Sequence, residues 1–198
     1  MKAYGIISRL RAAAIALVAL LATGACDDND ISELTFVGDS IIARWDLDEY
    51  FTGYVTVNLG KSGAGIDYVE SLKGRAAGRD AVVMIGTNDM AGIRGSQSEI
   101  ELYVSRYVDA VTGLGARHTY LYSILPRDFK GEVSLLPTIS EVNRLVKEAV
   151  AGRADVTYLD VYPLFVDGDG LDYALYSDRL HLSAAGYEVL AKSLLSQL

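Results

Sequence analysis

Short apolar strands alternate with longer helical segments along most of this chain, and this alternation limits the fold more than any other feature. The run Ala81-Val82-Val83-Met84-Ile85 contains no polar residue, which is typical of a strand buried on both faces of a sheet. Further segments predicted as strands are Leu34–Gly38, Tyr54–Asn58, His118–Leu125 and Val156–Val161. Because strands alternate with helices, we predict an α/β fold with about five mainly parallel strands.

The helical segments are predicted from apolar residues that recur near the 3.6-residue period of a helix. In Thr138–Ala151, for example, Ile139, Val142 and Val146 fall on one face. The same reasoning predicts helices at Ile41–Phe51, Gln97–Leu114 and Ala184–Gln197. Helices that connect parallel strands cover both faces of the sheet.

The N-terminal segment 1–25 has the pattern of a secretory signal peptide. Lys2, Arg9 and Arg11 precede an uninterrupted apolar run, Ala12–Ala22, and small residues follow it. The run is too short to span a bilayer, which takes about 20 apolar residues. We therefore predict secretion across the inner membrane, with the folded domain at 34–198.

Cys26 is the only cysteine of the chain and stands directly after the predicted signal peptide. The segment Leu21-Ala22-Thr23-Gly24-Ala25-Cys26 resembles the lipobox of bacterial lipoproteins, whose cysteine becomes lipidated. The resemblance implies a lipid anchor on Cys26 that holds the chain to a membrane of the cell envelope, in the periplasm or at the cell surface. Residues 26–33, with Asp27-Asp28-Asn29-Asp30, would then form an acidic tether.

The charge of the chain excludes some partners. All acidic residues lie after Cys26, so the part from Cys26 onward has 15 basic and 26 acidic side chains and a net charge of −11. This charge repels a phosphate backbone, and no nucleic-acid partner is expected. Only two histidines and the single cysteine are available as typical zinc ligands, and we predict neither a metal site nor a cofactor.

Polar residues capable of chemistry follow the predicted strands or precede the last helix. They occur in the segments Gly38-Asp39-Ser40, Asn58-Leu59-Gly60-Lys61-Ser62-Gly63, Gly86-Thr87-Asn88-Asp89 and Asp178-Arg179-Leu180-His181. In parallel sheets, active sites form at the carboxyl ends of the strands. Each segment alone could be explained as a turn or a helix cap, but their joint placement favours one shared site.

Together these segments offer the groups needed for acyl transfer. Ser40 is the candidate nucleophile, His181 the base that accepts its proton, and Asp178 the carboxylate that orients the imidazole. The N–H groups of Ser40 and Gly60 and the side-chain amide of Asn88 are the candidate donors of an oxyanion hole.

The same residues carry a resemblance to a known family. Phe36-Val37-Gly38-Asp39-Ser40-Ile41, Asn58-x-Gly60, Gly86-Thr87-Asn88-Asp89 and Asp178-x-x-His181-Leu182 resemble, in order, the four blocks of the SGNH hydrolase superfamily, which includes the GDSL-like lipases and acylhydrolases. The resemblance implies a flavodoxin-like, three-layer α/β/α sandwich. It also implies hydrolysis of esters or thioesters, with Ser40, Gly60, Asn88 and His181 as the four residues that give the superfamily its name.

We therefore expect a serine esterase that acts through a Ser40 acyl-enzyme on small or carbohydrate-linked acyl esters. Two alternatives stay open. One is a lysophospholipase or thioesterase with the same mechanism. The other is a non-catalytic surface lipoprotein that binds a glycan with the same site, although such a protein would have no need of a base at His181.

Overall fold

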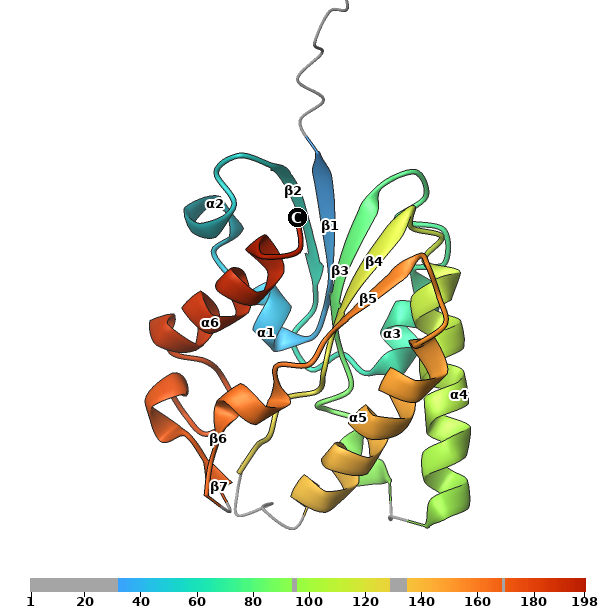
Figure 1. The fold of residues 1–198 in the computed structure, drawn as a ribbon, viewed down its shortest axis with the longest axis vertical. Helices are drawn as coiled ribbons and strands as arrows, with labels where there is room; N and C mark the ends of the chain where they lie inside the picture. The colour runs from blue at the N-terminus through green and yellow to red at the C-terminus, as the bar shows by residue number, and fades with distance from the viewer. Residues whose placement is uncertain (1–31, 94–95, 129–134, 169) are drawn as a thin grey trace, which may run out of the picture. The chain divides into compact units, whose positions relative to one another are not determined.

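A five-stranded sheet forms the centre of the computed structural model, which describes residues 32–93, 96–128, 135–168 and 170–198 (Figure 1). The strands are β1 (Glu33–Gly38), β2 (Val55–Gly60), β3 (Asp80–Met84), β4 (His118–Tyr122) and β5 (Val156–Leu159). Their order across the sheet is β2-β1-β3-β4-β5, and every neighbouring pair is parallel. The predicted signal peptide and Cys26 lie outside the described residues.

Helices cover both faces of this sheet (Figure 1). On one face lie α1 (Ser40–Ala43), α2 (Leu47–Tyr50) and α6 (Ala184–Leu195). On the other lie α3 (Ile66–Ser71), α4 (Gln97–Gly113) and α5 (Leu136–Val150). The predicted three-layer α/β/α sandwich is confirmed, and the strand order is that of a flavodoxin-like fold.

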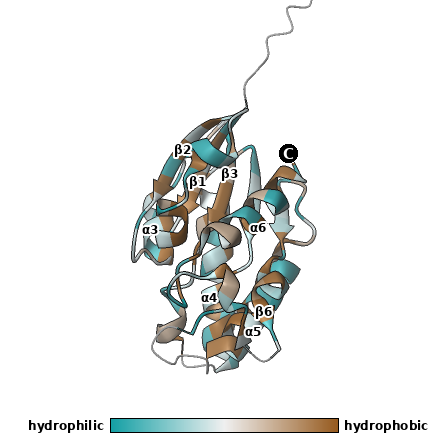
Figure 2. Cartoon of the chain, turned by 90° about the vertical axis from the view of Figure 1, so that its left-hand side faces the viewer, coloured by the Kyte–Doolittle hydropathy of each residue, from teal (hydrophilic) through white to brown (hydrophobic). Residues whose placement is uncertain are grey.

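Two hydrophobic cores fill the space between the layers, and β3 contributes to both. Val83 and Ile85 belong to the core under α3, α4 and α5, whereas Val82 and Met84 belong to the core under α1, α2 and α6. All four side chains are fully buried. Side chains of a strand alternate between its two faces, which is why the run 81–85, which starts in β3 and ends one residue after it, has no polar position. Figure 2 shows the largely apolar sheet between its more polar helices.

Smaller elements complete the described chain. The 3-10 helices are η1 (Met90–Gly92), η3 (Tyr162–Phe165) and η4 (Tyr173–Leu175). Between η3 and η4 the short strands β6 (Val166–Asp167) and β7 (Gly170–Leu171) pair in antiparallel fashion. No helix within the described ranges is long and apolar enough to cross a membrane.

The predicted helix Ile41–Phe51 is wrong as a single element, because the structure divides it into α1 and α2. The break lies at Arg44–Asp46, where the Asp46 side chain accepts a hydrogen bond from Glu49 N–H and caps α2. Trp45 at the break is 3% exposed and packs edge-on against Phe36. Burial of one large aromatic side chain thus outweighs the continuity of a helix.

The predicted strand His118–Leu125 is three residues shorter in the structure, where β4 ends at Tyr122. Beyond it, the side-chain amide of Asn143 on α5 binds both the N–H and the carbonyl of Ile124, each at 2.8 Å. A side chain thus replaces the neighbouring strand as hydrogen-bond partner, and the chain leaves the sheet.

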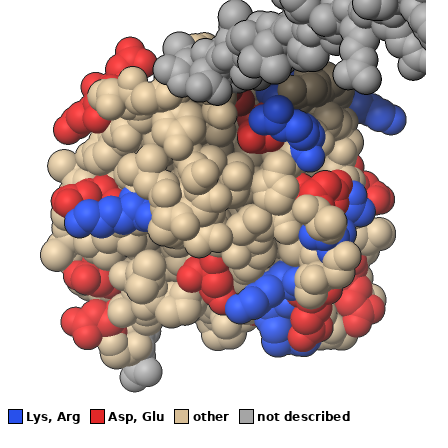
Figure 3. Space-filling model, turned by 45° about the horizontal axis from the view of Figure 1, so that its top comes forward, with Lys and Arg blue, Asp and Glu red and all other residues tan. Residues whose placement is uncertain are grey.

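The amino ends of the strands lie at the top of the molecule in Figure 1 and face the viewer in Figure 3. Charged side chains of both signs lie close together there, including the ion pairs Arg79–Glu33 at 2.7 Å and Arg117–Asp80 at 3.0 Å. The polar segments singled out above lie at the opposite, carboxyl end of the sheet.

Candidate active site

The turn that holds Ser40 is built by its two preceding residues. A side chain on Gly38 would place its Cβ 2.1 Å from the Met84 carbonyl oxygen, so only glycine lets β1 approach β3 here. Asp39 then caps α1, because its Oδ1 accepts a hydrogen bond of 2.9 Å from Ile41 N–H. Ser40 is the first residue of α1 and is 8% exposed, so its hydroxyl lies at the sheet edge with limited access to solvent.

The segment before α6 brings His181 to this serine. His181 Nε2 lies 3.1 Å from Ser40 Oγ, although the two residues are 141 positions apart in the sequence. On its other side, His181 Nδ1 lies 2.7 Å from Asp178 Oδ2. An imidazole that binds a carboxylate through Nδ1 presents Nε2 as an acceptor, which is the state a general base needs.

Asp178 is held by its own loop. Its Oδ1 accepts hydrogen bonds from the N–H groups of His181 at 2.7 Å and Leu180 at 3.2 Å. Partial desolvation raises the pKa of Asp178, but these bonds and the one from the His181 ring outweigh it, so the pKa lies below its ordinary value. Asp178 therefore stays ionised and available to the imidazole.

Asn58 already occupies the N–H group of Gly60, one of the predicted oxyanion donors. Gly60 N–H donates a hydrogen bond of 2.8 Å to Asn58 Oδ1, and Asn58 Nδ2 donates one of 2.9 Å to the Ile42 carbonyl. A Cβ on Gly60 would lie 2.3 Å from Ala43 N, so the glycine also permits close packing of β2 on α1. Gly60 thus has a structural role in this arrangement.

Asn88 lies beside the loop that follows Gly60. Its Nδ2 donates a hydrogen bond of 2.8 Å to the Ala64 carbonyl, and the second amide hydrogen remains for another acceptor. The neighbouring Gly63 has φ of +75°, and its N–H donates to no other residue in the described part of the chain. The only signal for Gly63 in the sequence was its place in the glycine-rich segment; its backbone conformation decides where its N–H lies.

Asp89 joins the two loops, a role that the sequence did not reveal. Its carboxylate accepts hydrogen bonds from Ile66 N–H at 3.1 Å and from the Tyr103 hydroxyl at 3.0 Å. A Cβ on Gly65 would lie 2.3 Å from Asp89 Oδ1, so this contact too depends on a glycine. The Asn88 turn is thereby fixed to α3 and α4.

Asp39 is buried next to the nucleophile. Burial raises the pKa of Asp39 to about 6, although the Ile41 N–H, the Thr87 hydroxyl and His181 each lower it in part. Asp39 Oδ2 and Thr87 Oγ1 nevertheless reach no hydrogen-bonding geometry with any described residue. The carboxyl group therefore lies in surroundings that disfavour its charge.

The second histidine lies at the other end of the sheet. His118 begins β4, and its Nε2 lies 2.8 Å from Thr157 Oγ1. His181 is thus the histidine that belongs to the site.

The described residues contain no group of three or more His, Cys, Asp or Glu side chains placed to hold a metal ion.

Solved structures with the same fold come from several bacteria. A Streptococcus pneumonia protein, assigned provisionally as a platelet activating factor, is 26% identical with a TM-score of 0.66, covering 84% of this chain and 83% of its own. A GDSL-like lipase from Bacteroides thetaiotaomicron is 17% identical with a TM-score of 0.68, over 85% of this chain and 88% of its own. An acetylxylan esterase from Geobacillus stearothermophilus is 19% identical with a TM-score of 0.61, over 84% of this chain and 93% of its own.

A search of curated proteins gave no match. The sequence model of the GDSL-like Lipase/Acylhydrolase family, in contrast, matches residues 36–189, a range that begins before Ser40 and ends after His181. The chain therefore belongs to the GDSL-like lipase/acylhydrolase family.

Proposed function

We propose that this family member is a serine esterase in which Ser40 forms an acyl-enzyme. The observation that carries the proposal is the hydrogen-bonded series Ser40–His181–Asp178, with distances of 3.1 and 2.7 Å. His181 Nε2 accepts the hydroxyl proton as Ser40 Oγ attacks the ester carbonyl, and the same proton then passes to the leaving alcohol. Water, activated by His181, hydrolyses the acyl-enzyme and releases the acid.

The charge that develops on the carbonyl oxygen needs hydrogen-bond donors. We assign Ser40 N–H and the Asn88 amide to this task, as the sequence suggests. Gly60 was the third candidate, but its N–H is bonded to Asn58. We infer that Gly63 supplies the third donor, because its N–H has no partner among the described residues and its neighbour Ala64 accepts a hydrogen bond from the Asn88 amide. Each such donor contributes about 3 to 4 kcal/mol of transition-state stabilisation in a serine hydrolase.

For the substrate we propose small acyl esters, including acetyl groups on carbohydrates. The acetylxylan esterase with the same fold supports this class, as does the predicted export of the chain to the cell envelope. Lysophospholipids and thioesters require the same chemistry and are the alternatives. Initial rates on esters graded by acyl length, with acetylated xylan, a lysophospholipid and an acyl thioester alongside, would identify the class.

The mechanism predicts the behaviour of a nucleophile variant. With p-nitrophenyl acetate, Ser40→Ala should lower kcat by about 1,000-fold or more, because the acyl-enzyme cannot form. A matched control is Ser105→Ala on the exposed face of α4, which should keep the wild-type rate. Equal rates for Ser40→Ala and wild type would refute the proposal.

A second measurement separates catalysis from mere glycan binding. A fluorophosphonate probe reacts with an activated serine and should label the wild-type chain at Ser40. A non-catalytic binding protein would stay unlabelled while still binding the glycan, and that result would favour the alternative function.

A further inference from the structure

The loop that carries Asp178 and His181 contains an unusual backbone conformation. Arg179, between them, has φ of +66° and is the one non-glycine residue with positive φ in the described part of the chain. For a residue with a Cβ this conformation costs about 1 to 2 kcal/mol, so it persists only where the surroundings enforce it. The turn at Arg179 lets Asp178 Oδ1 reach the N–H groups of Leu180 and His181.

A buried carboxylate from another loop holds this turn. Asp128, beyond the carboxyl end of β4, is 4% exposed. Its N–H donates a hydrogen bond of 3.1 Å to the Arg179 carbonyl, and its Oδ2 lies 3.1 Å from Arg179 Nη1. Asp128 thus binds both the side chain of Arg179 and its carbonyl, which belongs to the peptide between Arg179 and Leu180.

Tyr173 on η4 completes the cluster. Its hydroxyl donates a hydrogen bond of 2.7 Å to the same Asp128 Oδ2, and this bond raises the pKa of Tyr173. The Arg179 guanidinium also lies over the Tyr173 ring, 5.3 Å from its centre. One carboxylate therefore joins three segments: the β4 exit, η4 and the loop before α6.

The same loop is closed on its other side by Ser177. Ser177 N–H donates to the His181 carbonyl at 2.8 Å, and Ser177 Oγ donates to the same oxygen at 3.1 Å. The ends of the loop are thus tied to each other, and Asp128, together with the Tyr173 ring, ties its apex to the rest of the domain. Loss of that tie would leave Asp178 and His181 free to shift relative to Ser40.

We propose that Asp128, Arg179 and Tyr173 form a clamp that positions the Asp178–His181 pair for catalysis. None of the three needs to touch the substrate; they are positioning residues. The inference rests on the proposed esterase function, because positioning is measured by its effect on turnover. A displacement of about 1 Å at a reacting group can lower a rate by about 100-fold, so the clamp should affect kcat.

Two substitutions of Arg179 separate the effect of its backbone conformation from the effect of its side chain. Arg179→Ala removes the guanidinium and keeps a Cβ in the strained conformation, whereas Arg179→Gly removes the guanidinium but adopts positive φ freely. We expect Arg179→Ala to lower kcat about 10- to 100-fold with KM for p-nitrophenyl acetate changed less than about twofold. Arg179→Gly should recover most of this loss, and Asp128→Asn and Tyr173→Phe should lower kcat at unchanged KM.

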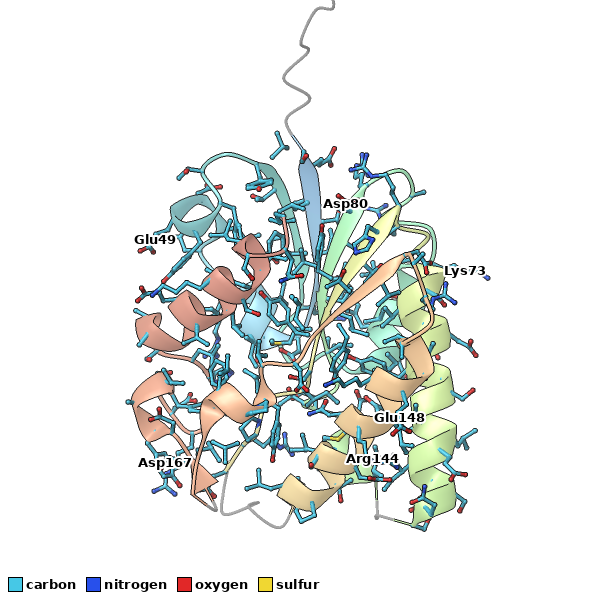
Figure 4. The ribbon with its side chains drawn as sticks, viewed as in Figure 1. Glu49, Lys73, Asp80, Arg144, Glu148 and Asp167 are labelled. Carbon is cyan, nitrogen blue, oxygen red and sulfur yellow. The ribbon has the colours of Figure 1, made fainter. Side chains whose placement is uncertain are left out.

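The control is Arg144→Ala. Arg144 lies on α5 beside Glu148 and forms ion pairs with Glu141 at 2.7 Å and Glu148 at 2.6 Å (Figure 4). Its substitution removes an exposed arginine with carboxylate partners, as Arg179→Ala does, but at a distance from the catalytic loop. It should keep the wild-type kcat. If Asp128→Asn fails to fold, the exposed Arg179 and Tyr173 variants still test the clamp.

A spectroscopic readout needs no substrate. The chain has two histidines, so ¹⁵N-histidine labelling gives two imidazoles, and His118→Gln assigns them. We expect the hydrogen-bonded Nδ1 proton of His181 to give a sharp downfield signal in wild type, Arg179→Gly and Arg144→Ala, and a broadened or shifted one in Arg179→Ala.

Wild-type kcat and an unchanged signal in Arg179→Ala and Asp128→Asn would overturn the clamp, as would Arg179→Gly being as slow as Arg179→Ala. A wild-type chain that gives the downfield signal but hydrolyses no ester would overturn the proposed function instead. The two failures are therefore distinguishable.

Discussion

The two carboxylate oxygens of Asp39, the residue before the nucleophile, lie in different surroundings. Its Oδ1 accepts the Ile41 N–H and starts α1, while its Oδ2 is buried without a hydrogen-bond partner among the described residues. The cap needs only an acceptor oxygen, which a neutral carboxyl group or an amide also supplies. The negative charge of Asp39 is therefore not needed for the turn and should reduce the stability of the folded chain.

This predicts a pH dependence of stability. The folded-state pKa of about 6 lies above the ordinary value of 3.8, so between these values the folded chain binds the proton more tightly than the unfolded one. Asp39 therefore stabilises the fold most below pH 3.8 and loses this contribution, about 3 kcal/mol at most, as pH rises through 6.

Urea unfolding of wild type and Asp39→Asn from pH 4 to 8 measures this effect. The free energy of unfolding of Asp39→Asn, minus that of wild type, should increase as pH rises, and this difference should level off above about pH 7. A difference that stays constant over the whole range would contradict the assignment.

At the level of elements, the glycines decide how closely strands and helices approach. The sequence predicted that the Gly60 N–H donates a hydrogen bond to the substrate oxyanion. In the structure, Gly60 lies where β2 packs against α1. A Cβ there would lie 2.3 Å from Ala43 N and 2.7 Å from Ala43 Cα, both of them backbone atoms that cannot move aside alone. Sequence patterns show that a glycine is present, but only the packed elements show which neighbour requires it.

Gly60→Ala should therefore destabilise the fold by about 1 to 3 kcal/mol, as overpacking does at other tight contacts. Gly53→Ala is the matched control, since a Cβ at Gly53 would meet no atom within 4 Å. Thermal unfolding should show a lower Tm for Gly60→Ala and a Tm near that of wild type for Gly53→Ala. Equal Tm values for both variants would show that β2 and α1 can move apart to make room for the added Cβ without a loss of stability.

At the scale of the whole molecule, a compact hydrolase domain follows a segment that the sequence predicts to be cleaved and lipidated. We propose that Cys26 carries the lipid and that the acidic residues after it separate the domain from the membrane. A single acyl chain binds a protein to a membrane only weakly, whereas several chains hold the protein there stably. Lipid on Cys26 would therefore anchor the domain through its acyl chains, without a membrane-spanning helix.

Cys26→Ala should abolish incorporation of labelled palmitate and move the protein from the membrane fraction to the soluble fraction. The esterase activity of the purified chain should not change, because Cys26 precedes the domain that holds Ser40. Palmitate incorporation that persists in Cys26→Ala would exclude this cysteine as the anchor.

The layers of the fold and the candidate reactive groups could be predicted from the sequence alone. An unbroken apolar run such as 81–85 is typical of a strand covered on both faces, and strands that alternate with helices favour parallel pairing. Ser40, Asp178 and His181 were predicted as partners because acyl transfer needs a hydroxyl, a base and a carboxylate, and parallel strands bring their carboxyl ends together.

The partners of the individual hydrogen bonds, in contrast, could be read only from the folded chain. Asn58 accepts the Gly60 N–H, Asp89 joins two loops, and Asp128 contacts Arg179 at positive φ; the last two contacts join residues far apart in the sequence. A local pattern reports residue type and spacing, but not which donor meets which acceptor. That choice depends on the packing of the whole chain, which no single segment contains.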